Sequence, residues 1–450
     1  MKKQIKKPVK VGFVSLGCPK NQLDTEVMLK QLYDDGFEIV SEETEADIVI
    51  INTCAFIESA KREAIDNIID IGWLKKHHTL KGIVVTGCLA ERYRDEIFTE
   101  LDEVDAILGV GSIHSICDAV RAVANGEKFS EYKDKNEVEL GGERIITTPE
   151  YTAYIKIAEG CDNRCTYCAI PDIRGKFRSR PMDDIIAEAK ELSSSGELKE
   201  LCVVAQDTTR YGIDLYGEYS LAKLLKRLCA ETDIPWIRIL YCYPDKITDE
   251  LVEVMRDNDR IVKYIDIPIQ HISDPVLKRM NRHGDRALIS STFEKLRREI
   301  PDITIRTTAI VGFPGEREED FTELCEFVKE MRFDHFGAFT YSREEDTPAY
   351  DLPDQIDEQI KQDRFDIIMR EQLLINEAKN QEKIGKTLSV LVEDYDEVSQ
   401  TYFGRSEADA PEIDGKVYFG GKRGELSPGE FVKVKIIEVC DYDLVGERIR

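Results

Sequence analysis

Three cysteines, Cys161, Cys165 and Cys168, follow the pattern C-x-x-x-C-x-x-C without a fourth cysteine beside them. Cysteine thiolates are the usual ligands of iron–sulfur clusters, and three of them hold three irons of a 4Fe–4S cube. The fourth iron then stays open to bind a small molecule. A structural zinc site needs four ligands, and a catalytic one usually includes histidine. No histidine lies between residues 151 and 233, so a cluster is favoured over zinc or three unrelated buried thiols.

A second set, Cys18, Cys54 and Cys88, is spread along the sequence, but each cysteine directly follows a short apolar segment. If these segments are parallel strands, their carboxyl ends meet at one edge of a sheet, and the three thiols converge there. Helices that begin just after the cysteines would favour the thiolates through their positive ends. The pattern predicts a second cluster. The alternative is three small side chains buried at strand ends.

The first part of the chain alternates between strand and helix. Strands are predicted at residues 9–16, 46–52 and 82–86, with helices at 21–35 and 58–74. This alternation indicates a parallel sheet with helices on its faces. The polar segment 126–148 is expected to be a linker.

The alternation resumes after the linker. Strands are predicted at residues 151–158, 201–205, 236–242, 264–269, 303–311 and 335–341, with helices such as 183–193 and 320–331 between them. Six such units indicate an incomplete (β/α)6 barrel, whose site lies at the carboxyl ends of its strands. A long helix at 357–383 is followed by β-rich pieces at 386–393, 417–419 and 431–439. These pieces predict a small C-terminal β-barrel or sandwich, and the fold class is α/β.

The composition limits the function classes. The chain has 450 residues and a formal net charge of −26, without an apolar run long enough to span a membrane. Twelve cysteines without a secretion signal indicate the reducing cytoplasm and metal ligation. The acidic balance argues against stable nucleic-acid binding and favours a basic partner, unless it only serves solubility.

The cysteine triplet, with Tyr167 before its last cysteine, resembles the signature of the radical S-adenosylmethionine (SAM) superfamily. In that superfamily the open iron binds SAM, and an electron cleaves SAM to a radical that removes hydrogen from an unreactive C–H bond. The phrases around Cys18, Cys54 and Cys88, and Val-Gly-Phe-Pro-Gly-Glu at 311–316, further resemble the methylthiotransferase family. This resemblance covers residues 9–450.

The resemblance implies three domains. An N-terminal domain at 9–125 carries an auxiliary 4Fe–4S cluster on Cys18, Cys54 and Cys88. A radical SAM barrel at 147–378 carries the second cluster on the triplet, and a TRAM-like β-domain occupies 380–448. The two clusters and SAM carry the chemistry, and no catalytic side chain is assigned. The other cysteines match no ligand position and are expected to pack in the interior: Cys117, Cys202, Cys229, Cys242, Cys325 and Cys440.

SAM itself is expected at the ends of the barrel strands. The candidates for contact with SAM are Tyr167, Gln206, Arg306 and Gly312, with Arg306 pairing with the SAM carboxylate. Further strand-end candidates, each with a structural role as the alternative, are Asp207, Gln270, His271, Gly315 and Glu316. The basic run 174–180 is expected to pair with carboxylates of SAM or substrate, or to be a solvated loop.

Two branches of the family differ in substrate. One modifies the β-carbon of an aspartate in the twelfth small-subunit ribosomal protein, and the other modifies an adenosine in transfer RNA. The segment 404–415 closely resembles a phrase of the ribosomal-protein branch. From residue 380 onward, 10 Lys and Arg stand against 15 Asp and Glu, whereas an RNA-binding domain normally has a basic face. The ribosomal-protein reaction is therefore expected, with the transfer-RNA reaction as the alternative.

The partners follow from this expectation. The acidic residues Glu407, Asp409, Glu412 and Asp414 are expected to dock the basic ribosomal protein, free or on the ribosome, unless they form an ordinary solvated turn. An electron donor such as flavodoxin is expected to reduce the clusters.

Overall fold

The computed structural model describes residues 8–449, which form two compact units. The first unit contains the chain up to Thr147 together with Ala158–Arg180 and Glu344–Thr347. The second contains Thr148–Ile157, Pro181–Arg343 and the chain from Pro348 onward. Both cysteine sets therefore belong to the first unit, whereas the C-terminal barrel belongs to the second. The domain boundaries derived from the sequence stay a prediction.

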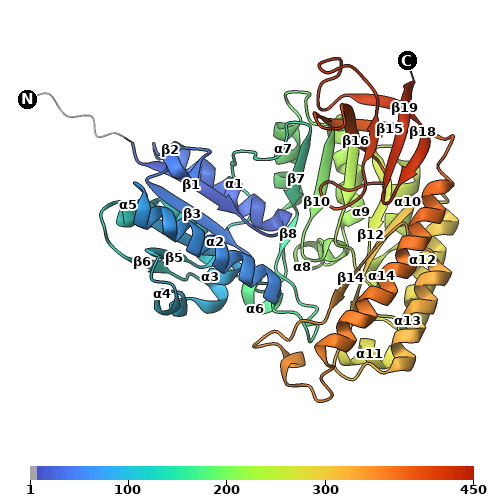
Figure 1. Cartoon of the computed structure of the whole chain (residues 1–450), viewed down its shortest axis with the longest axis horizontal. Coiled ribbons are helices and arrows are strands. Elements are labelled where there is room, and N and C mark those ends of the chain that lie inside the picture. Colours follow the sequence, from blue (N-terminus) through green and yellow to red (C-terminus); the bar gives the residue numbers. More distant parts are fainter. Residues whose placement is uncertain (1–7, 450) are drawn as a thin grey trace, which may run out of the picture. The chain divides into compact units, whose positions relative to one another are not determined.

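The first unit is built on a six-stranded, fully parallel sheet of order β2-β1-β3-β4-β5-β6 (Figure 1). Its strands are β1 (Lys10–Ser15), β2 (Glu38–Ile39), β3 (Ile48–Thr53), β4 (Gly82–Gly87), β5 (Ala106–Leu108) and β6 (Phe129–Glu131). The predicted parallel sheet is confirmed. The linker prediction was wrong at β6, where Phe129 packs against the sheet's core and extends the sheet.

Helices cover both faces of this sheet. On one face, α1 (Pro19–Asp34) and α5 (Ile116–Ala124) share a buried cluster with Ile48 and Ile50. On the other face, α2 (Glu58–His77) packs in a cluster with Val49 and Ile51. Successive side chains of a strand point to opposite faces, so β3 must be apolar throughout.

The second unit contains a six-stranded parallel sheet of order β14-β13-β12-β11-β10-β7, which confirms the predicted incomplete barrel. The strands are β7 (Thr152–Lys156), β10 (Glu200–Val204), β11 (Trp236–Ile239), β12 (Ile261–Asp266), β13 (Thr304–Val311) and β14 (His335–Thr340). The longer helices of this unit are α7 (Met182–Leu192), α9 (Leu221–Glu231), α10 (Asp249–Asp257), α12 (Arg286–Glu299), α13 (Glu318–Met331) and α14 (Glu358–Gln381). Within the described residues, no helix is long and apolar enough to cross a membrane.

A closed barrel of order β15-β16-β17-β19-β18 ends the chain, as expected. Its strands are β15 (Thr387–Asp396), β16 (Thr401–Ser406), β17 (Val417–Phe419), β18 (Phe431–Cys440) and β19 (Asp443–Ile449). Val390, Tyr402, Phe419 and Ile436 lie in its buried core. The sequence did not reveal β16 and β19.

Candidate active site

Three neighbouring strands of the first unit end at the second cysteine set. Cys54 directly follows β3, Cys88 directly follows β4, and Cys18 comes three residues after the end of β1. These strands are adjacent and parallel, so the three loops share one edge of the sheet, as predicted. Cys18 is the N-cap residue of α1, and Cys88 is the first residue of α3 (Cys88–Tyr93).

Two glycines keep this edge open. Gly17 has φ +92°, and a Cβ placed on it would lie 2.8 Å from the Cβ and 3.2 Å from the Sγ of Cys54. Gly87 has φ +90°, and a Cβ there would collide with the backbone of Thr53. Both positions combine a backbone conformation suited to glycine with a close approach of the neighbouring cysteine loop.

The thiols of this set influence one another. Burial raises the pKa of Cys54 to about 12, and the neighbouring Cys88 and Cys18 add to the rise. Burial also raises the pKa of Cys88, against the effect of Arg174. At Cys18 burial is outweighed by Lys20, Arg174 and two backbone N–H groups, so its pKa is lowered. The loops bring the three thiols close enough to interact, which the sequence predicted.

Three converging thiols have the donor chemistry of an iron–sulfur cluster. Among residues 8–449, no three His, Cys, Asp or Glu side chains are grouped closely enough to hold one metal ion. In an iron–sulfur cube each thiolate binds a different iron, so its ligands stand farther apart than those of a single ion. Three thiols on three neighbouring loops can each bind a different iron.

The triplet lies in a loop of the first unit between β8 (Ala158–Glu159) and α6 (Ile170–Arg174). β8 pairs with β9 (Arg178–Ser179), and the Cys161 N–H donates to the carbonyl of Gly175 at 3.1 Å. Gly160 has φ +78°, and a Cβ there would lie 2.1 Å from the Lys176 carbonyl oxygen. The base of the loop is thus fixed close to the chain segment that leaves it.

The SAM candidates belong to different units. Tyr167 lies in the triplet loop of the first unit, whereas Gln206 and Gly312 lie in the second, two residues after the end of β10 and directly after the end of β13. Gly312 has φ +74°, and its N–H donates to Glu316 Oε2 at 2.6 Å. The strand-end positions are confirmed, and the roles of these residues toward SAM stay predictions.

Glu316 and His271 have structural partners in the second unit. Glu316 accepts the N–H groups of Gly312 and Phe313 and pairs with Arg364 at 3.0 Å, so it shapes the turn after β13. Burial nevertheless raises the pKa of Glu316 to about 7. The buried His271 accepts the Ser273 N–H at Nδ1, and burial lowers the pKa of His271 to about 3. Both residues are better explained as structural than as SAM ligands.

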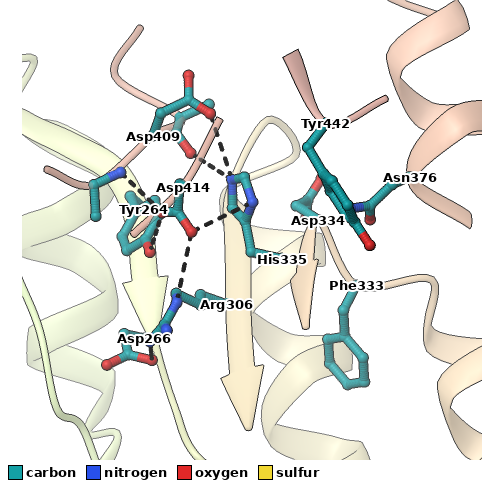
Figure 2. A network of polar contacts seen from close by, with 12 residues as sticks. Tyr264, Asp266, Arg306, Phe333, Asp334, His335, Asn376, Asp409, Asp414 and Tyr442 are labelled. Atoms are coloured by element: carbon teal, nitrogen blue, oxygen red, sulfur yellow. Dashed lines mark hydrogen bonds and ion pairs between the residues drawn. The ribbon is translucent and has the colours of Figure 1, made fainter. Parts of the chain in front are cut away.

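Arg306 does not fit its predicted role. It lies near the amino end of β13, and its guanidinium pairs with Asp266 at 3.0 Å and with Asp414 at 3.6 Å. Figure 2 shows it bridging these two carboxylates. Its charge is already balanced at the end of the strand opposite the expected site. We therefore withdraw Arg306 as the partner of the SAM carboxylate.

The predicted acidic docking surface is also corrected. Asp409 is buried, and the Asp414 side chain is only 3% exposed. His335, the first residue of β14, lies between them at 3.6 and 3.5 Å, as Figure 2 shows. Asp414 also accepts the Tyr264 hydroxyl at 2.7 Å. The resemblance at 404–415 therefore marks a segment that packs against the six-stranded sheet, and of its four acidic residues Glu407 and Glu412 are exposed.

The basic run 174–180 begins with a buried residue, so it is not solvated along its whole length. Arg174 is buried and donates to Asp24 Oδ2 at 2.5 Å, Asn21 Oδ1 at 2.8 Å and Cys88 Sγ at 3.5 Å. Sequence reasoning missed Asn21 and Asp24, because polar residues on a helix are usually solvated. Their position just after Cys18 was the available signal.

The remaining cysteines are free thiols. Cys202, Cys229 and Cys242 are buried, as expected for packing residues, and Cys117 and Cys325 are half-buried. Cys440 is exposed, so the packing prediction was wrong there.

Three family models match successive parts of the chain. They are uncharacterized protein family UPF0004 at residues 10–109, the radical SAM superfamily at 155–328 and the TRAM domain at 384–449. A solved radical S-adenosylmethionine methyltransferase, TsrM from Kitasatospora setae with cobalamin and a 4Fe-4S cluster bound, has a TM-score of 0.58 at 16% identity and 77% coverage of each chain. This likeness concerns the fold. The family match, the fold and the cysteine triplet together define a radical SAM enzyme.

Curated relatives show to which family of radical SAM enzymes the chain belongs. The ribosomal protein uS12 methylthiotransferase RimO of Desulforamulus reducens is 49% identical, covering 97% of this chain and 99% of its own. RimO of Thermoanaerobacter sp. is 50% identical with the same coverage, and that of Clostridium tetani is 48% identical over 97% and 98%. The chain therefore belongs to the family of ribosomal protein uS12 methylthiotransferases.

Proposed function

We propose that this protein transfers a methylthio group to the β-carbon of an aspartate in ribosomal protein uS12. The observation that carries the proposal is the convergence of Cys18, Cys54 and Cys88 at one sheet edge, in the compact unit that also holds the triplet. An enzyme that only cleaves SAM needs one three-cysteine set. A second set provides a place for the sulfur to be transferred.

The proposed cofactors are two 4Fe–4S clusters and SAM. Cys161, Cys165 and Cys168 would hold the first cluster, and Cys18, Cys54 and Cys88 the auxiliary one. When bound, these groups supply radical activation of a C–H bond and a carrier for the methylated sulfur.

The chain's own residues bind and position these groups. Gly17, Gly87 and Gly160 leave room beside the cysteine loops. Tyr167 in the first unit, and Gln206 and Gly312 in the second, stay proposed contacts of SAM, and Glu316 holds the turn at Gly312. Exclusion of water and of other C–H groups protects a reactive radical, so the site must be closed during turnover.

The proposed acceptor is a basic protein. The C-terminal barrel and the net charge of −26 favour a Lys- and Arg-rich partner over a phosphate backbone, so stable nucleic-acid binding is not expected. Because Asp409 and Asp414 are buried, they do not dock it. We further propose a cytoplasmic enzyme reduced by a donor such as flavodoxin.

Mass spectrometry tests the proposal directly. Ribosomal proteins and transfer RNA are compared between cells with and without this protein, and cells complemented with Cys54→Ala serve as the matched control. Loss of the methylthio mass from an aspartate of uS12, restored by the wild type but not by the variant, is expected. Loss from a transfer-RNA adenosine instead would reject the proposed acceptor in favour of the alternative branch.

A further inference from the structure

A buried arginine connects the triplet segment with the second cysteine set inside the first unit. Arg174 ends α6, six residues after Cys168, and its side chain is 3% exposed. Its Nη1 faces Asp24 at 2.5 Å and Glu159 at 3.6 Å, and its Nη2 faces Asn21 and the Cys88 thiol. One edge of the guanidinium thus binds carboxylates, and the other reaches a proposed cluster ligand.

Asn21 extends this contact to the other two cysteine loops. Its Oδ1 accepts from Arg174, and its Nδ2 donates to the carbonyls of Leu16 at 2.7 Å and Thr53 at 3.2 Å. Leu16 lies two residues before Cys18, and Thr53 directly precedes Cys54. Arg174 and Asn21 therefore bond to all three loops of the set.

The electrostatic consequence follows from the burial of this cation. A guanidinium is always charged, and its planar fork allows it to hold a carboxylate and a sulfur at once. A hydrogen bond and a positive charge at a cluster sulfur stabilise the more negative, reduced cluster, since such contacts set cluster potentials. The effect is strong because little water screens it.

We infer that Arg174 is a positioning residue that raises the reduction potential of the auxiliary cluster by donating to Cys88. This inference rests on the proposed function, because it requires the auxiliary cluster on Cys18, Cys54 and Cys88. It replaces the two roles that the sequence left open for Arg174, since its guanidinium is occupied inside the first unit and reaches neither bulk solvent nor a free substrate carboxylate.

The test isolates the auxiliary cluster. In a parent protein with Cys161, Cys165 and Cys168 all changed to Ala, the cluster is reconstituted anaerobically and titrated by electron paramagnetic resonance. Arg174→Lys keeps the positive charge but loses the planar guanidinium. Arg174→Gln keeps an N–H hydrogen-bond donor but loses the charge. The matched control is Arg144→Lys, because Arg144 is likewise a buried arginine of the first unit, 5% exposed, and pairs with Glu26 of α1.

We expect both Arg174 variants to keep their iron and to require a lower potential for reduction than the parent. A roughly tenfold change in the reduced-to-oxidised ratio at a fixed potential is expected, which is about 59 mV for a one-electron couple. The larger shift should belong to Arg174→Gln, and Arg144→Lys should match the parent.

Three results would overturn the inference. An unchanged potential in both Arg174 variants means that Arg174 does not tune the cluster. Loss of the cluster from both variants, with Arg144→Lys intact, means that Arg174 only supports the fold. A parent that binds no iron would reject the auxiliary cluster itself, and thus the proposed function. The titration needs no ribosomal protein, so an unmodified uS12 in the cellular test is a separate failure.

Discussion

Both compact units bury arginines in polar networks, but the partners of these arginines differ in chemical type. In the first unit, Arg174 divides its hydrogen bonds between Asp24, Asn21 and the Cys88 thiol. In the second, Arg238 and Arg405 share the fully buried Glu200, both at 2.7 Å. Their other partners include the Glu407 and Asp409 carbonyls and the Glu393 carboxylate. A buried arginine is therefore not a sign of a reactive site unless one of its partners is a reactive group.

The acidic segment after β16 meets the same end of the six-stranded sheet as this second network. Glu200 begins β10 and His335 begins β14, so the charged residues of the C-terminal segment meet the amino ends of these strands. Buried ion pairs often add little net stability, but removing one partner is costly because the other charge stays buried.

The largest predicted effect separates the two cysteine sets in the first unit. Cys54→Ala should abolish methylthio-uS12 formation and lower the iron content by about four per chain. SAM cleavage in the absence of uS12 should still be detectable in this variant. Cys165→Ala should abolish SAM cleavage as well. Product is measured by mass spectrometry, 5′-deoxyadenosine by chromatography and iron by colorimetry. Wild-type product formation by Cys54→Ala would contradict the sulfur-carrier role.

A substitution in the network of Glu200, Arg238 and Arg405 should lower the stability of the protein and leave its iron content unchanged. Glu200→Gln leaves Arg238 and Arg405 without their shared counter-charge, and the expected loss of unfolding free energy is about 3–5 kcal/mol. The matched control is Glu231→Gln, because Glu231 pairs with Arg227 and Lys190 at the surface and should change stability little. Urea denaturation measures both. Equal stability of the two variants would show that the Glu200 network is not structural.

Glu316 should give the second unit a pH-dependent stability. Burial raises its pKa to about 7 in the folded protein, against an ordinary value of about 4.3. Between these values the folded state keeps a proton that the unfolded state has lost, so stability falls as pH rises and levels off above about 7.

The variant Glu316→Gln should remove this dependence. The difference in unfolding free energy between wild type and variant is expected to change by up to about 3 kcal/mol between pH 4.3 and 7. Anaerobic urea denaturation at several pH values from 5 to 8 measures it. Parallel curves for the two proteins would mean that Glu316 stays ionised throughout.

The smallest predicted effect concerns the exposed part of the acidic segment. Reversing Glu407 and Glu412 to Lys should leave stability nearly unchanged and slow the association with uS12 at low salt, because opposite charges mainly raise the association rate. Asp409→Asn and Asp414→Asn should instead destabilise the second unit. Association is measured by stopped flow at low and moderate salt. An unchanged rate at both would place docking elsewhere.

Local patterns were sufficient for most elements and for both cysteine sets. Apolar runs such as those of β3 and β4 identify buried parallel strands, and the position of a cysteine after each run predicts convergence without any knowledge of packing. β6 and β19 escaped prediction, because strand propensity depends on pairing with neighbours more than on the segment's own sequence.

The sequence by itself determined the family, the three-part order of folds and the six cysteines proposed to hold the clusters, because these depend on residue type and spacing along the chain. Only the tertiary structure decided the partners of the charged residues. From the sequence alone, four charged residues were predicted to be surface or ligand-binding groups: Arg174, Arg306, Asp409 and Asp414. Their partners lie far away in the sequence, because Arg174 pairs with Asp24, Arg306 with Asp414 and Asp409 with His335. A charge acts through distance and burial, and neither is visible until the chain has folded.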